Sequence, residues 1–191
     1  MTVPAAFARA LTACAGSSLL LLSACGSPIA TVTPSSSTSP SGTASRTFTA
    51  TGFSTVIPAG WEDQTSNQAA VASVSGSGTV LMLLIAPDGG HIDVRAAPQP
   101  VPDDQLARYL ESVSQSGATN LSTAVPVDID GVSGVMITYN LAPSPGVVAK
   151  DEDMVVNQGG NTYDIVLNTA SATFTQDAAA LQAVLNSWKW S

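Results

Sequence analysis

The chain has 191 residues and a formal net charge of −8, from 14 acidic and 6 basic side chains. A composition this acidic, with no cluster of Lys and Arg, makes the chain a poor candidate for binding the phosphate backbone of nucleic acids. Only 10% of the residues are charged, against ~25% in an average domain, as expected for an exported protein whose surface is covered by uncharged polar side chains.

Residues 1–24 predict a signal peptide. One positive charge, Arg9, precedes an apolar run from Ala10 to Leu22. A helix that crosses a bilayer needs ~20 apolar residues, so this run is too short for a membrane span. Its length and its small residues fit the apolar segment of a cleaved secretory signal.

The last residues of this leader, Leu22-Ser23-Ala24-Cys25, resemble the lipobox of bacterial lipoproteins. The resemblance implies that the chain is cut before Cys25 and that the Cys25 thiol carries a diacylglyceryl group. Each buried methylene adds about 0.8 kcal/mol of membrane affinity, so two or three acyl chains hold a protein at a bilayer. We therefore expect a lipid-anchored protein on the outer, extracytoplasmic face of the cell membrane. The alternative is an ordinary signal peptide cut at the same place, with Cys25 as an unmodified thiol.

Residues 25–45 predict a disordered tether. Beyond Cys25 they are almost entirely Ser, Thr, Pro, Gly and Ala, which cannot bury enough apolar surface to offset the entropy of ordering the backbone. Ser/Thr tracts with proline are also the composition of O-glycosylated stalks. Because Cys14 leaves with the leader and Cys25 is lipidated, the domain predicted over 46–191 contains no thiol and no disulfide.

The first part of this domain predicts strands. Arg46 to Ile57 fits a hairpin with its turn around Ala50 to Gly52, and Trp61 follows a Pro-Ala-Gly turn, where it would plug the edge of a core. Ala69 to Val74 is the next candidate strand. Thr79 to Ala86 has no polar alternation, which predicts a strand buried on both faces.

A helix is predicted in the middle of the domain. His91 to Ala96 fits either a short strand or an exposed crossover, and three prolines then lead to a helix that starts near Pro102 to Asp104 and stops at Gly117. One apolar stripe of this helix should face a sheet; its residues are Leu106, Tyr109, Leu110 and Val113.

The rest of the domain predicts further strands and a closing helix. Asp130-Gly131 favours a tight turn between two strands, and Gly159 to Asn161 joins two more. The predicted strands cover Asn120 to Ile129, Val132 to Leu141, Lys150 to Gln158 and Thr162 to Thr169. Thr173 and Gln176 have the spacing of a capping box, so a helix should begin there. The order of elements predicts an α+β domain, in which helices pack on an antiparallel sheet.

The run from Phe53 to Trp61, Phe-Ser-Thr-Val-Ile-Pro-Ala-Gly-Trp, resembles the opening of PsbP/Mog1-like domains. Together with the lipobox and the tether, the whole chain resembles actinobacterial lipoproteins of the LpqN type. That resemblance implies a non-catalytic cell-envelope protein that meets an envelope protein or lipid, reaches the membrane through its lipid anchor, and carries no cofactor.

Residues for catalysis or metal binding are scarce. His91 is the sole histidine, and no nucleophile-elbow pattern accompanies it, so we expect a solvated loop histidine. The sequence lacks ligands for zinc and a glycine-rich phosphate loop. The carboxylates of Asp128 and Asp130, and of Asp151 and Asp153, do not match an EF-hand loop. Alternating acids on a strand are expected to face solvent.

Three functions therefore stay open. The first is a lipid-anchored binding protein with a groove for a partner protein or an apolar envelope molecule. Candidate groove residues are Trp61, Tyr109, Trp188 and Trp190, for which core or rim packing is the alternative role. The second function is an inert structural or surface lipoprotein. The third is an envelope hydrolase that would use His91 and a distant serine.

Overall fold

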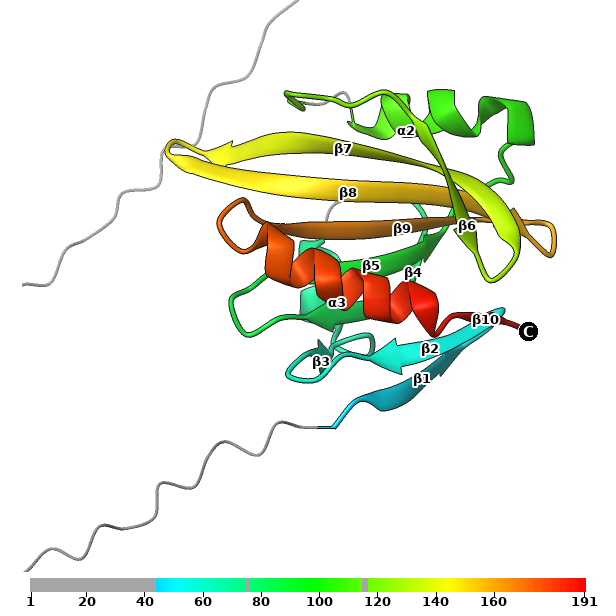
Figure 1. Ribbon diagram of the computed structural model, residues 1–191, viewed down its shortest axis with the longest axis horizontal. Helices are drawn as coiled ribbons and strands as arrows, with labels where there is room; N and C mark the ends of the chain where they lie inside the picture. The colour runs from blue at the N-terminus through cyan, green and yellow to red at the C-terminus, as the bar shows by residue number, and fades with distance from the viewer. Residues whose placement is uncertain (1–43, 75, 115–116) are drawn as a thin grey trace, which may run out of the picture. The chain divides into compact units, whose positions relative to one another are not determined.

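The computed structural model describes residues 44–74, 76–114 and 117–191, which form two antiparallel sheets and their covering helices (Figure 1). The predicted signal peptide, the lipobox with Cys25 and nearly all of the predicted tether lie outside the described residues, so those assignments stay predictions. Within the described ranges, no helix is both long and apolar enough to cross a membrane.

The larger sheet has seven strands in the order β3-β4-β5-β9-β8-β7-β6, and the smaller has the order β1-β2-β10. The strands of the larger sheet are β3 (Glu62–Asp63), β4 (Thr79–Ile85), β5 (His91–Ala96), β6 (Val125–Ile129), β7 (Val132–Ser144), β8 (Val147–Gln158) and β9 (Asn161–Ala170). Those of the smaller sheet are β1 (Arg46–Ala50), β2 (Phe53–Ile57) and β10 (Lys189–Trp190). The helices are α1 (Gln68–Ser73), the short 3-10 turn η1 (Asp103–Gln105), α2 (Leu106–Ser114) and α3 (Phe174–Asn186).

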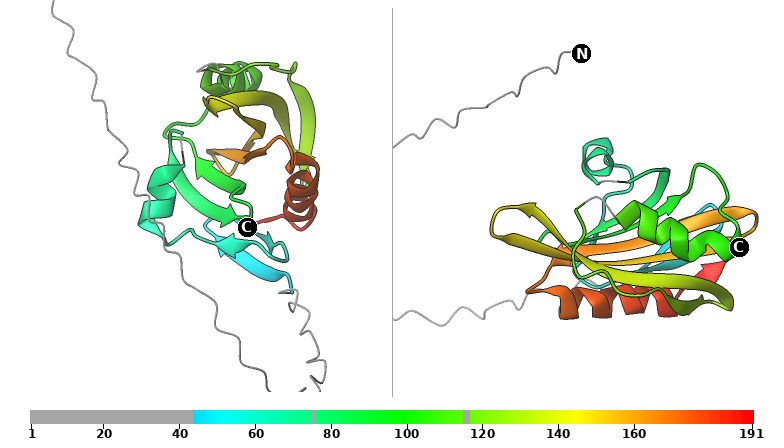
Figure 2. Two further views of the ribbon diagram at one scale, coloured as in Figure 1. Left: turned by 90° about the vertical axis from the view of Figure 1, so that its left-hand side faces the viewer. Right: turned by 90° about the horizontal axis from the view of Figure 1, so that it is seen from above.

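The seven-stranded sheet is covered on both faces, with α3 on one side and α2 on the other (Figure 2). Two neighbouring residues of β8 show the division, because successive side chains of a strand point to opposite faces. Val156 belongs to the large core that also contains Leu181 of α3, whereas Val155 packs with Leu110 of α2. Both faces of β8 are therefore buried at this point of the sheet.

Most of the predicted strands and turns are confirmed. The hairpin of β1 and β2 turns at Thr51 and Gly52. β4 is buried on both faces, since Met82 and Leu83 are both fully buried neighbours. At the turn between β6 and β7, Asp130 and Gly131 have φ angles of 50° and 81°, as that turn type requires. The α+β class with an antiparallel sheet and packed helices is also confirmed.

The prediction of a strand from Ala69 to Val74 is wrong, because this segment forms helix α1. The side chain of Asn67 accepts hydrogen bonds from the backbone N–H groups of Ala69 and Ala70, which caps the helix at its N-terminus. The alanines that follow Asn67 favour a helix. Asn67, a residue type that favours helix N-caps, is the local signal for this helix.

For one further segment the structure decides between two predicted alternatives, and for another it corrects the predicted cap. His91–Ala96 forms a central strand, β5, so the alternative of an exposed crossover is ruled out. Helix α3 begins where expected, but the predicted capping box is absent: Thr173 makes no side-chain capping bond. Its hydroxyl instead lies 2.9 Å from the hydroxyl of Thr169 at the end of β9, a tertiary contact that competes with the local one.

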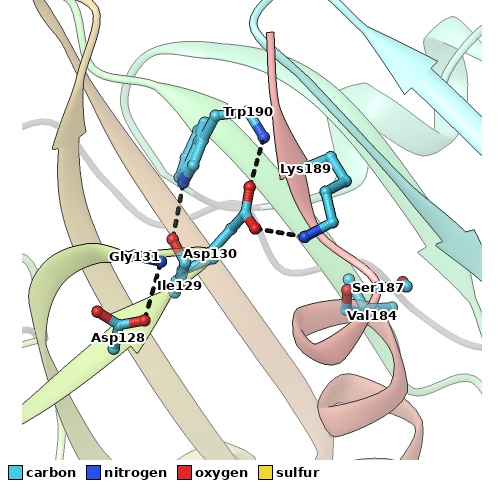
Figure 3. Close-up of polar contacts among 8 residues, drawn as sticks. All are labelled: Asp128, Ile129, Asp130, Gly131, Val184, Ser187, Lys189 and Trp190. Carbon is cyan, nitrogen blue, oxygen red and sulfur yellow. Dashed lines mark hydrogen bonds and ion pairs between the residues drawn. The ribbon is translucent and has the colours of Figure 1, made fainter.

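The C-terminus is fastened to the turn between β6 and β7 (Figure 3). Lys189 Nζ lies 2.5 Å from Asp130 Oδ1, and the backbone N–H of Trp190 donates to Asp130 Oδ2 at 3.1 Å. The indole N–H of Trp190 donates to the carbonyl of Ile129 at 2.7 Å. These bonds join the end of the three-stranded sheet to the edge of the seven-stranded sheet.

Candidate functional site

The face of the seven-stranded sheet opposite α3 carries a row of ionisable side chains. Strand register aligns them: Arg95 of β5 lies opposite Asp164 of β9. Val166 of β9 lies between Asp93 of β5 and Asp153 of β8. Next along the strands, Asn168 lies between His91 and Asp151. We call the residues His91, Asp93, Arg95, Asp151, Asp153 and Asp164 the carboxyl cluster.

The four aspartates of this cluster lie in the interior. Asp93, Asp151, Asp153 and Asp164 have exposed fractions of 0%, 1%, 2% and 4%. The prediction that the alternating acids of β8 face solvent is wrong, because β8 lies inside a sheet that is covered on both faces. Of the other predicted carboxylate pair, Asp128 and Asp130 are exposed at the β6–β7 turn.

Arg95 supplies a positive charge inside the cluster. Its Nε lies 2.7 Å from Asp93 Oδ2, and its side chain is 7% exposed. Gly76 covers it closely: a Cβ atom on Gly76 would lie 1.6 Å from a terminal nitrogen of Arg95. The loop that leads to β4 therefore needs glycine at this position to close over the guanidinium.

His91 belongs to the same row, so the expectation of a solvated loop histidine is wrong. It lies on β5 with its side chain 20% exposed and its Nε2 3.5 Å from Asp93 Oδ1. Burial, with a smaller contribution from the positive charge of Arg95, lowers the pKa of His91 to about 4. The imidazole is therefore neutral at physiological pH.

Burial raises the pKa values of the aspartates. Burial is the largest cause for Asp93: together with the smaller effects of the negative charges of Asp164 and Asp151, and against the charge and hydrogen bond of Arg95, it raises the pKa of Asp93 to about 7. For Asp151, burial raises the pKa to about 6, against a hydrogen bond from Asn168. These carboxyl groups lose their protons near neutral pH instead of near pH 4.

Asp153 and Asp164 form a carboxyl pair across β8 and β9. A hydrogen bond joins the two side chains, and burial raises both pKa values, that of Asp153 furthest, since the negative charge of Asp164 adds to it. One oxygen each of Asp151, Asp153 and Asp164 has no hydrogen-bond partner among the described residues. A proton held by Asp153 and donated to Asp164 is the arrangement that keeps this pair stable.

The cluster does not have the geometry of a metal centre. In the described ranges, no group of three or more His, Cys, Asp or Glu side chains could hold a metal ion. The four aspartates lie on three different strands, and Val166 of β9 lies between Asp93 and Asp153.

A cavity of about 520 Å³ lies beside α2, next to the cluster. Its walls come from the proline-containing segment before η1, from the outer side of α2 and from Ser77. The lining residues are Ser77, Ala97, Pro98, Gln99, Pro100, Val101, Pro102, Gln105, Arg108, Tyr109 and Ser112. The space directly under α2 is filled by Leu106 and Leu110.

Tyr109 connects the cavity to the carboxyl cluster. Its side chain lines the cavity. Its hydroxyl is buried close to Ser77, and in the described part of the chain no group lies in position to form a well-aligned hydrogen bond with it. Burial and the negative charge of Asp164 raise the pKa of Tyr109. The tyrosine therefore keeps its proton and presents a neutral hydroxyl.

The structure separates the four residues predicted for a groove. Trp61, Trp188 and Trp190 contribute to the core beneath α3, where Trp188 and Trp190 pack edge to face with their ring centroids 5.2 Å apart. Tyr109 packs against the smaller core on the opposite face. Of the four, Tyr109 is the residue that lines the cavity.

Comparison with solved structures identifies the fold. The solution structure of cyanobacterial PsbP (CyanoP) from Synechocystis sp. PCC 6803 matches with a TM-score of 0.50 and 16% identity, covering 84% of this chain and 99% of that chain. The domain has a PsbP-like fold. This confirms the fold that the run from Phe53 to Trp61 implied; at such low identity the similarity concerns the fold alone.

A crystal structure from Bacteroides thetaiotaomicron VPI-5482 is also similar, with a TM-score of 0.46 and 14% identity, over 73% of this chain and 45% of that chain. No family model matches the sequence, and no curated protein matches it. The PsbP-like domain of this chain is thus recognised by its structure.

Sequence reasoning missed three members of the carboxyl cluster, Asp93, Arg95 and Asp164. A signal was present: Asp93 and Arg95 alternate with Ile92 and Val94 on a strand that follows the strongly apolar β4. A charge on a strand next to a doubly buried strand is expected to need a partner. Asp93 and Arg95 have opposite charges and lie two residues apart on one face, so they are the expected ion pair.

Proposed function

We propose that this protein is a lipid-anchored, non-catalytic binding protein of the cell envelope that holds an apolar envelope molecule or an apolar segment of a partner protein. The observation that carries the proposal is the cavity beside α2. Its volume lies within the ~300–1,000 Å³ that is usual for small-molecule sites. Its walls join the pyrrolidine rings of Pro98 and Pro100 to the aromatic ring of Tyr109.

The polar groups of the cavity would orient a bound molecule. Gln99, Gln105 and Arg108 provide polar side chains at the more exposed parts of the lining. A mainly apolar wall with a few polar groups is the usual design of a site for a small amphiphilic molecule. The chemistry therefore favours an apolar molecule with a polar end.

Membrane attachment comes from Cys25 in this proposal. Removal of the leader takes Arg9 away and leaves the chain with a formal charge of −9, so anionic lipid surfaces repel it weakly. The lipobox supplies the anchor that such a domain lacks. This arrangement is the one implied by the resemblance to lipoproteins of the LpqN type.

Catalysis is not part of the proposal. His91, the sole histidine, lies next to Asp93 on β5 and has its pKa lowered to about 4 by burial. A general base that works at neutral pH needs a pKa near 7 and contact with the nucleophile. The sequence offers no nucleophile-elbow serine to go with it.

Binding of the neutral apolar fluorophore N-phenyl-1-naphthylamine tests the cavity. The probe should gain fluorescence with the lipid-free Cys25→Ser chain, and Ser112→Trp, which places an indole in the cavity, should weaken its binding at least tenfold. Gln182→Trp, on the exposed side of α3, is the matched control and should bind like the parent. Equal binding by both tryptophan variants would reject the cavity as the site and favour an inert surface lipoprotein.

A further inference from the structure

We propose that the carboxyl cluster is a proton-binding site that controls opening of the α2 side of the domain. In acid the cluster holds its protons and α2 stays closed. As the pH rises past neutrality, the protons leave and α2 opens. The inference does not depend on a ligand in the cavity, so it stands or falls separately from the proposed function.

The charges inside the sheet give the first argument. If all four aspartates of the carboxyl cluster were ionised, Arg95 would balance one of them, and among the described residues three negative charges would remain without a cation. Buried carboxylates without a partner are strongly unfavourable, and the usual response is to bind a proton. The folded domain therefore stores protons that an unfolded chain would release.

In the described part of the chain, the titratable groups that face this cluster agree with this interpretation. They are His91, Asp93 and Arg95 from β5, Asp151 and Asp153 from β8, Asp164 from β9, Tyr139 from β7 and Tyr109 from α2. Burial lowers the pKa of His91 and raises those of Tyr109 and Tyr139, so these three are neutral. Arg95 is the single cation among them.

The sign of the pH effect follows from linkage. A carboxyl whose pKa is higher in the folded state than in the unfolded state binds more protons when folded, so stability falls as the pH rises through the folded pKa. For Asp93 that window runs from 3.8 to about 7, and for Asp151 from 3.8 to about 6. The lowered pKa of His91 acts in the opposite sense between about 4 and 6.5. Above pH 6.5 the carboxyl groups decide the slope.

The two faces of the sheet differ in how much they lose on opening. Among the residues whose burial the structure describes, the core beneath α3 contains 18 buried apolar residues and the core beneath α2 contains 5. Lifting α2 with the loop at Gly76 would admit water to the carboxyl cluster, which lies on that face, and would expose the smaller core. Local opening therefore requires less free energy at α2 than at α3.

Thiol labelling can locate the opening. Leu110→Cys in α2 and Leu181→Cys in α3 replace two fully buried leucines, in the full chain with Cys14 and Cys25 changed to serine. Protection is measured against the labelling rate of the urea-unfolded chain at each pH. Leu110→Cys should be at least tenfold less protected than Leu181→Cys at pH 8.5, and its protection should fall at least tenfold between pH 6.5 and 8.5. Equal protection at the two sites, or no pH dependence at Leu110→Cys, would overturn the proposal.

Urea unfolding of the full chain checks the proton count without cysteine variants. Each proton that only the folded state binds increases the unfolding constant tenfold per pH unit, so we expect a rise of at least tenfold between pH 6.5 and 8.5. Asp153→Asn, which removes one proton site and keeps the shape, should reduce that rise. Asp104→Asn, at an exposed position in η1, should leave it unchanged. A rise below twofold in the unsubstituted chain overturns the proposal, whether or not Asp153→Asn folds.

Discussion

Asp130 and Lys189 lie 59 positions apart in the sequence and form an ion pair of 2.5 Å (Figure 3). Asp130 also accepts the backbone N–H of Trp190, so one turn residue holds both residues of β10. The contact closes the fold where the last strand meets the β6–β7 turn. Both partners lie at the surface, so the contact fastens β10 from outside the core.

Asp130→Asn should loosen this C-terminal fastening. The bonds from Lys189 and the Trp190 backbone lower the pKa of Asp130, so its contribution is present above pH 3.8 and is lost as the pH falls through the folded pKa. Asparagine tolerates the positive φ of this turn and removes the charge. Hydrogen exchange should become faster at Trp190 and stay unchanged in β8. Unchanged exchange at Trp190 would mean that the ion pair does not hold the strand.

Trp188→Ala should lower the free energy of unfolding by about 3–5 kcal/mol, the usual cost of truncating a buried aromatic side chain. The Trp188 ring is 1% exposed and stacks on Phe53 with the ring centroids 4.2 Å apart. Denaturant unfolding followed by circular dichroism measures the change. The exposed Ala183→Gly in α3 is a control for helix propensity and should cost ~1 kcal/mol. A loss for Trp188→Ala no larger than that would argue for a binding role of Trp188.

Cys25→Ala should abolish labelling by fatty acid and leave the chain unprocessed or released from the membrane. The physical reason is that, under the lipobox assignment, two or three acyl chains on Cys25 would supply the membrane affinity. Growth with a radioactive or clickable fatty acid, followed by membrane fractionation, measures the effect. Cys14→Ala, within the predicted signal peptide, is the control and should be labelled normally. Persistent labelling of Cys25→Ala would refute the lipobox assignment.

Local sequence signals predicted the parts of the fold that depend on local geometry. The Asp130-Gly131 turn and the alternation of Tyr163, Ile165 and Leu167 depend on a two-residue turn and on the period of a strand. The structure confirms both, and it places these three side chains in the core beneath α3. The run from Phe53 to Trp61 added the PsbP-like fold.

The buried carboxyl cluster could not be predicted in the same way. Asp151 and Asp153 alternate as the polar face of an exposed strand does, and no local pattern reveals that α2 and the loop at Gly76 cover that face. The identity of the partners of Asp153, on β9 and β5, depends on strand order. Strand order is set by packing across the whole sheet, so the sequence of β8 alone does not determine it.

Gly76→Ala should destabilise the domain because it disturbs the cover over Arg95. Gly76 has a φ of +135°, and an added Cβ would lie 1.6 Å from a terminal nitrogen of Arg95. Arg95 is ion-paired with Asp93 and is almost fully buried, so it has little room to move away. Overpacking of this kind usually costs about 1–3 kcal/mol. Displacement of the guanidinium would also leave Asp93 with less opposing positive charge, which raises its pKa further.

Gly60→Ala provides the matched comparison, because Gly60 also has a positive φ, +85°, but an added Cβ there meets nothing within 4 Å. The Gly60 variant measures the cost of an alanine at a positive φ in open space, whereas the Gly76 variant adds the close approach to Arg95 at a φ of +135°. We expect Gly76→Ala to be less stable than Gly60→Ala in urea unfolding. We also expect it to lose stability at a higher pH than the parent does, since linkage moves the window with the pKa of Asp93. Equal stability of the two variants would show that the loop can move away from Arg95, and the carboxyl cluster would then be open to water without any movement of α2.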